Sequence, residues 1–223
     1  MQKRVLVFAA HPDDDVIGCG GSLAKHIAKG NAVCVCYMTS GESASVDVPK
    51  RELGRIRERE ARNAAQVLGF RDLIFLRNPD GYLEYSKRNL VRLVGLIRKK
   101  RPNIVYVPHR LDNHRDHAVT FELVCESLRR AEVGLFQECS GKQWSVDVVL
   151  AYEVWTPLPC FEYVEDVSDF VDMKFAALEK HESQLSIVQY DEASRSLARF
   201  RGAMTGKGKY CEVFNVQRMS GIL

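Results

Sequence analysis

The chain has 223 residues, of which 46% are hydrophobic, so it is long enough to bury one sizeable core and is expected to form one domain. Its 32 basic and 29 acidic residues leave a net charge of +3, which is too small to indicate a nucleic acid or a membrane surface as partner. The seven cysteines contain no Cys-x-x-Cys pair, and the N-terminus has no signal-peptide pattern. These features favour reduced thiols in a cytoplasmic protein without stable membrane insertion.

Short apolar runs alternate with amphipathic segments along the first two thirds of the chain. Apolar runs predict strands, and apolar residues at helical spacing predict helices. In chain order, the expected elements are strand 4–10, helix 19–29, strand 32–38, helix 50–68, strand 72–76, helix 86–100, strand 103–107, a helix over about 117–131 and strand 146–154. Nearly continuous apolar strands between helices predict an α/β fold, in which a doubly wound, mostly parallel sheet has helices on both faces.

The pattern weakens after Pro157 and Pro159. A helix over about 168–180 and a late strand over 211–217 are expected there. Trp144 and Trp155 flank the strand at 146–154, and packing is a sufficient explanation for both. We therefore expect a single domain over 1–223, with a core over about 1–155 and a C-terminal extension over about 156–223.

Two unusually polar stretches follow the first and fourth expected strands. Residues 11–15 read HPDDD, and residues 108–117 read PHRLDNHRDH. In doubly wound sheets, ligands bind beyond the carboxyl ends of the strands where the strand order reverses, and strands one and four are commonly neighbours at that point. The two stretches are therefore expected to face each other, although about a hundred residues separate them.

These stretches contain the side chains of a metal site. His114 and His117 are three residues apart at the start of a helix and can project from the same side. With His11 and one aspartate they supply imidazole and carboxylate ligands, of which a catalytic zinc site uses three, although two histidines and a carboxylate also suit iron(II). A divalent cation would relieve the repulsion among the three consecutive aspartates. Taken singly, each stretch has a plainer explanation as a helix N-cap or a structural histidine, and only their expected convergence favours a metal.

The same stretches resemble the signatures of a known family. AHPDDDVIGCGGSLA at 10–24 and PHRLDNHRDH at 108–117 resemble those of the PIG-L/LmbE-like zinc-dependent N-deacetylases. The resemblance extends over nearly the whole chain and implies a Rossmann-like fold and the removal of an acetyl group from an N-acetylglucosamine unit. Position 15 is Asp, where the family usually has Glu. Further similar segments are TSGE at 39–42, RERE followed by LG within 57–69, KFAALEKHESQ at 174–184 and YCEVF at 210–214.

The resemblance also implies individual roles. His11, Asp14 and His117 correspond to the ligands of one Zn²⁺ per chain, with Fe²⁺ or another divalent metal as the alternative. Asp13 corresponds to the general base, and His114 corresponds to the group that stabilises the oxyanion or protonates the leaving amine.

Four more positions are expected near the substrate or the ligands. Arg57 and Asp80 correspond to residues that hold the sugar hydroxyls. Asp112 or Asp116 could orient a histidine, and the sequence leaves that choice open. His181 and Glu212 lie in family-like segments without an assigned role.

The expected function is zinc-dependent hydrolysis of the acetamide of an N-acetylglucosamine-containing small molecule, by metal-activated water. Two alternatives stay open: the same metal site acting on a non-sugar amide or ester, and a sugar-binding protein without catalysis. The resemblance also points to a homo-oligomer, while the group attached to the sugar is undetermined.

Overall fold

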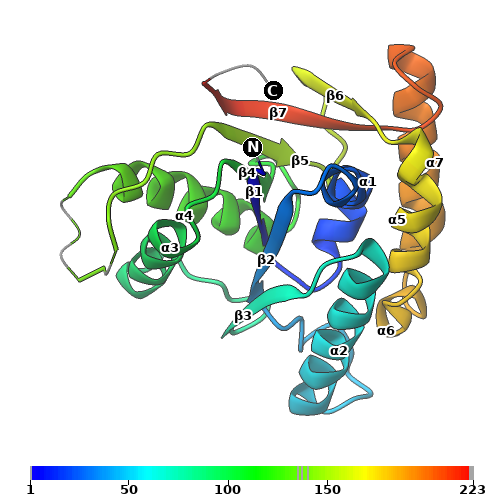
Figure 1. Ribbon diagram of the computed structural model, residues 1–223. Helices are drawn as coiled ribbons and strands as arrows, with labels where there is room; N and C mark the ends of the chain where they lie inside the picture. Colours follow the sequence, from blue (N-terminus) through cyan, green and yellow to red (C-terminus); the bar gives the residue numbers. More distant parts are fainter. Residues whose placement is uncertain (1, 135, 137, 140, 221–223) are drawn as a thin grey trace.

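In the computed structural model, a seven-stranded sheet with helices on both faces organises the chain (Figure 1). The structure describes residues 2–134, 136, 138–139 and 141–220. The strands are β1 (Arg4–Ala9), β2 (Ala32–Thr39), β3 (Asp72–Asn78), β4 (Ile104–Pro108), β5 (Val148–Tyr152), β6 (Tyr163–Asp166) and β7 (Cys211–Met219). The helices are α1 (Asp14–Ala28), α2 (Lys50–Leu68), α3 (Lys87–Lys100), α4 (Arg115–Glu132), α5 (Val171–Leu178), α6 (Glu182–Leu185) and α7 (Tyr190–Thr205), with a 3₁₀ turn at Ser168–Phe170.

The strand order is β3-β2-β1-β4-β5-β7-β6. Strands β1 to β5 pair in parallel, whereas β7 runs antiparallel to both β5 and β6. The order reverses between β1 and β4, which are direct neighbours. The predicted α/β class with a doubly wound, mostly parallel sheet is therefore confirmed.

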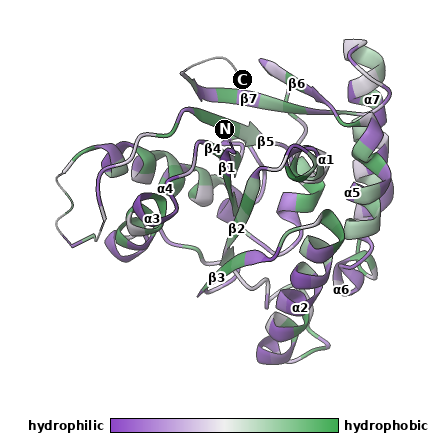
Figure 2. Cartoon of the chain, in the orientation of Figure 1, coloured by the Kyte–Doolittle hydropathy of each residue, from purple (hydrophilic) through white to green (hydrophobic). Residues whose placement is uncertain are grey.

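Alternation along β1 shows how the two faces of the sheet are covered. Val5, Val7 and Ala9 belong to the core cluster that contains residues of α1, α2 and α5, whereas Leu6 and Phe8 belong to the cluster that contains residues of α3 and α4. Successive side chains of a strand point to opposite faces, so a strand covered on both faces has to be apolar throughout. Figure 2 shows this pattern, with green strands inside and largely purple outer surfaces on α2 and α3.

Helix α1 begins at Asp14, earlier than the predicted residue 19. Its first turns contain three glycines, which are poor helix formers, and one of them, Gly18, lies in the segment 14–18 that the sequence pattern missed. Close packing explains two of them, because a Cβ on Gly18 would lie 2.1 Å from the Tyr152 ring and one on Gly21 would lie 2.7 Å from Val167. The backbone at Cys19 is non-helical, so α1 has a kink at this residue.

The C-terminal third departs most from the prediction. The expected helix over 168–180 is a 3₁₀ turn followed by α5, and the expected strand over 211–217 is the longer β7. Strand β6 and helix α7 were not predicted. The buried positions of α7 are Ser194, Ala198, Arg201 and Gly202, so this helix lacks the large apolar stripe that reveals an amphipathic helix. None of the helices in the described part of the chain has the length and apolar character needed to cross a membrane.

Candidate metal centre

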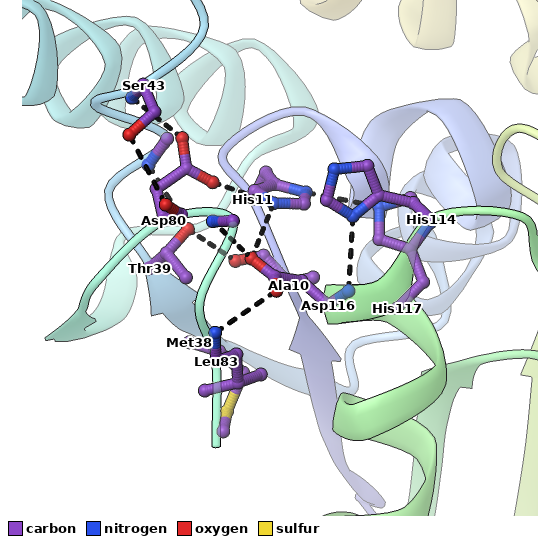
Figure 3. A network of polar contacts seen from close by, with 12 residues as sticks. Ala10, His11, Met38, Thr39, Ser43, Asp80, Leu83, His114, Asp116 and His117 are labelled. Atoms are coloured by element: carbon purple, nitrogen blue, oxygen red, sulfur yellow. Dashed lines mark hydrogen bonds and ion pairs between the residues drawn. The ribbon is translucent and has the colours of Figure 1, made fainter.

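The two polar stretches meet at the carboxyl ends of β1 and β4. The first directly follows β1 and leads into α1, and the second connects β4 to α4. His11 Nδ1 lies 3.1 Å from His117 Nε2, although 106 positions separate the residues (Figure 3). The expected convergence of the stretches is thus present in the fold.

Asp14 accompanies both histidines. Its carboxylate lies 3.6 Å from His11 Nδ1 and 3.4 Å from His117 Nε2, and it also accepts a hydrogen bond from the backbone N–H of His11 at 2.8 Å. All three side chains are buried. The three residues assigned as metal ligands are therefore together, with their nearest donor atoms 3.1–3.6 Å apart.

Carboxylates face the outer nitrogens of both rings. His117 Nδ1 lies 2.9 Å from Asp112 Oδ1, in hydrogen-bond geometry. His11 Nε2 lies 3.0 Å from Asp80 Oδ1 and 3.4 Å from Asp116 Oδ2, close enough for ion pairing but without hydrogen-bond geometry. These carboxylates favour a proton on the outer nitrogens, so the inner nitrogens, which face each other, are the ones that can offer lone pairs to a metal.

The surroundings favour positive charge at this point. Burial by itself lowers the pKa of His11 and His117, but the neighbouring carboxylates outweigh it, raising the pKa of His11 well above its usual value and that of His117 to about 9. Burial opposes ionisation of Asp14, yet the two histidines hold its pKa well below the usual value. Protons on the two rings supply this positive charge, and a divalent cation held by the inner nitrogens and the ionised Asp14 carboxylate would replace them.

Two overlapping sets of possible ligands surround His11 within the described residues. One comprises His11, His114 and His117, and the other comprises His11, Asp80 and Asp116. In the second set, Asp116 already accepts the backbone N–H groups of Gly81 and Leu83 at 2.8 and 3.2 Å. The side of His11 that faces His117 offers a second imidazole together with the Asp14 carboxylate, which suits a zinc site better than one histidine with two carboxylates.

His114 is the N-cap residue of α4, and its ring is oriented by the backbone. His114 Nδ1 accepts the N–H of Asp116 at 3.2 Å, which leaves the proton on Nε2. Burial, followed by the charges of His11 and His117, lowers the pKa of His114 and keeps the ring neutral at pH 7. The question of which aspartate orients a histidine ring has a divided answer. Asp112 contacts the ring of His117, and the Asp116 side chain faces the ring of His11. Asp112 also accepts the backbone N–H of His114 at 3.0 Å, but neither carboxylate contacts the His114 ring.

Asp13 lies beside this group with an unusual backbone. Its φ of 134° falls in a region that residues with a Cβ rarely adopt, and such strain concentrates at functional positions. Burial raises the pKa of Asp13 to about 7, with Asp14 adding to the shift and Arg57 opposing it. Arg57 fixes the carboxylate through an Nη2 contact to Asp13 Oδ2 at 3.1 Å, and it also donates to the carbonyls of Pro12 and Gly41.

Asp15 points away from the other two aspartates. Its Oδ1 accepts a hydrogen bond from the Tyr37 hydroxyl at 3.1 Å, and burial raises its pKa to about 7. The position at which the chain departs from the family pattern is therefore a buried contact between α1 and β2, outside the pocket that the other two aspartates line.

A pocket of about 300 Å³ opens above these residues. Its floor is polar, with His11, Asp13, Asp14, Arg57, Asp80 and His114. Its rim is apolar and aromatic, with Trp155, Ile187, Val188 and Tyr190. The interpretation of Trp155 as a packing residue needs correction, because 52% of this residue is exposed at the rim. A lone tryptophan in a loop carries no sequence signal that would have predicted its place at the rim of the pocket.

Glu212 and His181 have different surroundings. Glu212 accepts the backbone N–H groups of Gly21 and Ser22 at 2.9 and 2.8 Å and pairs with Lys174 at 2.8 Å, so it holds α1 in place. His181 is fully buried, and neither of its ring nitrogens has a hydrogen-bond partner among the described residues. Burial, with a further effect from Arg57, lowers the pKa of His181 to about 3, which keeps the ring neutral.

Comparison with known proteins identifies clear relatives. The family model described as PIG-L, GlcNAc-PI de-N-acetylase, matches residues 6–128. A diacetylchitobiose deacetylase of Thermococcus kodakarensis is 30% identical over 94% of this chain and 81% of its own length. A 4-oxalmesaconate hydratase of Pseudomonas putida is 28% identical over 85% of this chain and 77% of its own length. The crystal structure of a conserved protein from Thermus thermophilus superposes with a TM-score of 0.88 and 27% identity, covering 100% of this chain and 98% of that one.

Proposed function

This chain belongs to the PIG-L family of de-N-acetylases, and from that premise we propose that it removes the acetyl group from an N-acetylglucosamine-containing small molecule. It is an enzyme that hydrolyses amide bonds. The observation that carries the proposal is the pair of inner nitrogens, His11 Nδ1 and His117 Nε2, which face each other across 3.1 Å on the floor of a pocket. We also propose a cytoplasmic location for the protein, which accords with the absence of disulfides among its seven cysteines.

We assign His11, Asp14 and His117 as the ligands of one zinc ion. The two lone pairs and the ionised carboxylate supply three ligands, and Fe²⁺ would suit the same donors. When bound, the ion would lower the pKa of a water molecule and polarise the acetyl carbonyl. Asp112 would keep His117 in the tautomer that ligation needs.

Asp13 is proposed to take the proton of the attacking water. A general base works best when its pKa is close to the working pH, and that of Asp13 is about 7. Its contact with Arg57 holds the carboxylate toward the pocket. As the C–N bond breaks, the protonated Asp13 can donate that proton to the leaving nitrogen, so that the nitrogen departs as a neutral amine and the carboxylate of Asp13 is regenerated.

His114 is proposed to donate a hydrogen bond to the oxyanion of the tetrahedral intermediate. Its Nδ1 is occupied by the backbone N–H of Asp116, so the Nε2–H is the free donor. A donor fixed in advance stabilises developing charge without reorganisation. Arg57 and Asp80 also line the pocket, which supports their proposed contact with the sugar hydroxyls.

The test is acetate release by zinc-loaded protein, with chelator-treated protein as the control. The panel contains N-acetylglucosamine, N,N'-diacetylchitobiose, an N-acetylglucosamine–inositol conjugate and N-acetyl-lysine as a non-sugar amide. We expect metal-dependent release from at least one sugar and none from N-acetyl-lysine. Release from the non-sugar amide alone would instead favour another amide substrate.

The hydratase relative motivates a second assay on the same preparations. The assay measures the addition of water to 4-oxalmesaconate, monitored as the loss of absorbance of this compound. We expect no turnover. Hydration without acetate release from any sugar would overturn the proposed function while leaving the metal assignment in place.

A further inference from the structure

Trp155 is a large exposed ring between two hollows. It lies in the loop that follows β5, and 52% of the residue is exposed. Trp155 and Tyr190 line both the catalytic pocket and a neighbouring hollow of about 170 Å³. The second hollow also contains Ile17, Val154 and Leu197, so its wall is largely apolar. A substrate longer than one sugar would therefore pass from the polar floor across the indole of Trp155.

The position of Trp155 is fixed relative to the metal centre. Asp112 Oδ2 accepts the backbone N–H groups of Trp155 and Thr156 at 2.9 and 3.1 Å, while Asp112 Oδ1 contacts His117. The indole packs edge-on against the His114 ring with centroids 5.3 Å apart, and its centroid is 6.2 Å from that of Tyr190. A ring held in this way costs little conformational entropy when it binds a ligand.

The charges around the two hollows argue against an anionic neighbour to the sugar. Arg57 is the only lysine or arginine among the described residues that line the catalytic pocket, and its two terminal nitrogens already contact Asp13 and two backbone carbonyls. In the neighbouring hollow, Lys174 contacts Glu212 and the carbonyl of Ile17, both at 2.8 Å. The charges of these two cations are already balanced by Asp13 and Glu212, and the other buried carboxylates nearby would repel a phosphate or carboxylate on the substrate.

We propose that Trp155 is the platform for the unit attached to the N-acetylglucosamine ring, and that this unit is a neutral second pyranose whose apolar face lies on the indole. The proposal rests on the deacetylase function proposed above. It makes Trp155 a residue that determines specificity, since its contact lies beyond the acetamide that reacts.

The kinetic test compares Trp155→Ala and Trp155→Phe with the wild type on three substrates. These are N,N'-diacetylchitobiose, the methyl glycoside of N-acetylglucosamine, which lacks a second ring, and N-acetylglucosamine 1-phosphate, which is anionic. We expect Trp155→Ala to lower the ratio of kcat/KM for the disaccharide over the methyl glycoside by about 3- to 10-fold. Trp155→Phe should keep most of that ratio because it retains an aromatic face, and the phosphate should be the poorest substrate of the wild type.

A binding readout separates this proposal from catalysis. The chain has two tryptophans, and Trp144 lies at the opposite end of the strands, where its Nε1 donates to the carbonyl of Pro102, just before β4. Trp144→Phe therefore leaves Trp155 as the only indole fluorophore. We expect N,N'-diacetylchitobiose to change the emission of Trp144→Phe, whereas the methyl glycoside should change it less.

The outcomes distinguish the two proposals. Acetate release with an unchanged substrate ratio in Trp155→Ala and no emission change would overturn the platform while leaving the deacetylase function intact. An emission change without acetate release from any sugar would support the platform and overturn the deacetylase function. Turnover of the 1-phosphate equal to that of the disaccharide would overturn the requirement for a neutral neighbour.

Discussion

Three consecutive aspartates at the end of β1 have three different environments. Asp13 faces Arg57, Asp14 faces the two histidines, and Asp15 accepts the hydroxyl of Tyr37. Burial raises the pKa of Asp13 and of Asp15 to about 7, whereas the histidines keep the pKa of Asp14 well below its usual value. Neighbouring side chains of one type can therefore differ in protonation, which reduces the repulsion that the sequence alone suggests.

Asp13→Asn is expected to retain the metal and lose about 10²- to 10⁴-fold in kcat, because the amide cannot accept the proton of water. Steady-state acetate release and metal content by elemental analysis check this. Asp15→Asn is the matched control, since the amide oxygen can still accept the Tyr37 hydroxyl, and its kcat should stay close to that of the wild type. Loss of metal from Asp13→Asn with retention in Asp14→Asn would reverse the two roles.

Asp112→Ala is expected to weaken zinc binding about 10- to 100-fold, because His117 would lose the carboxylate that fixes its tautomer. Competition with a chromogenic chelator measures the affinity. Asp147→Ala is a control at the other end of the sheet, where the carboxylate contacts Asn103. Equal zinc affinity in Asp112→Ala and the wild type would show that the tautomer does not depend on this contact.

Much of the site follows from the sequence, because topology fixes where strand ends meet. The meeting of His11 with His117 required only the neighbouring positions of β1 and β4. The orientation of His114 by a backbone N–H and the position of Trp155 at the rim depend on loop geometry, which residue types and spacing do not encode.

At the scale of elements, α1 is held from behind by the C-terminal part of the chain. Glu212 of β7 binds the backbone at Gly21 and Ser22, and Lys174 of α5 pairs with Glu212 and also donates to the carbonyl of Ile17. Both charged side chains are about 2% exposed. The helix that begins at Asp14 is therefore fixed at its middle by a buried ion pair.

Glu212→Gln is expected to lower the free energy of unfolding by about 3–5 kcal/mol, because it leaves the Lys174 charge buried without its partner. Urea denaturation with an unchanged m-value measures the loss. Asp72→Asn removes the exposed ion pair with Lys100 and should cost only about 0–1 kcal/mol. Equal losses of unfolding free energy in the two variants would contradict the view that the buried Glu212–Lys174 pair acts as a clamp on α1.

The elements that the sequence predicted are those with large apolar faces. The helix over 50–68 was predicted with the bounds that α2 has, and each of the five parallel strands was found. Helix α7 was not predicted because small and polar residues form its buried side. The start of α1 was missed in part because packing against Tyr152 requires glycine at position 18. The periodicity of apolar residues reveals helices that bury large side chains, and it does not reveal helices that pack through small ones.

At the scale of the whole molecule, acid should destabilise the fold through His26. Its Nε2 contacts the Tyr106 hydroxyl at 2.9 Å and its Nδ1 accepts from Asn31 at 3.1 Å, so the neutral ring uses both nitrogens. Burial lowers the pKa of His26 from 6.5 to about 4. Between these values the unfolded chain binds the extra proton, so the stabilisation is complete above pH 6.5 and is lost as the pH falls to 4.

This dependence amounts to up to about 3 kcal/mol, since one pKa unit corresponds to about 1.4 kcal/mol. Urea titrations of the wild type and of His26→Gln between pH 4 and 7 measure the difference, in which the contributions of other groups cancel. The difference in the free energy of unfolding between the wild type and His26→Gln should become smaller as the pH falls. A gap that is constant over this range would show that His26 does not titrate as proposed.

The clamp on α1 also has a consequence for synthesis on the ribosome. Glu212 is 191 positions after Gly21, so the backbone that it secures emerges long before Glu212 does. A domain generally folds as a unit, so the residues made early depend on contacts from the residues made later. The stretch with Asp13 and Asp14 is thus translated well before the residues that support it, and a chain interrupted before β7 would carry every candidate ligand without the strand that holds α1 in place.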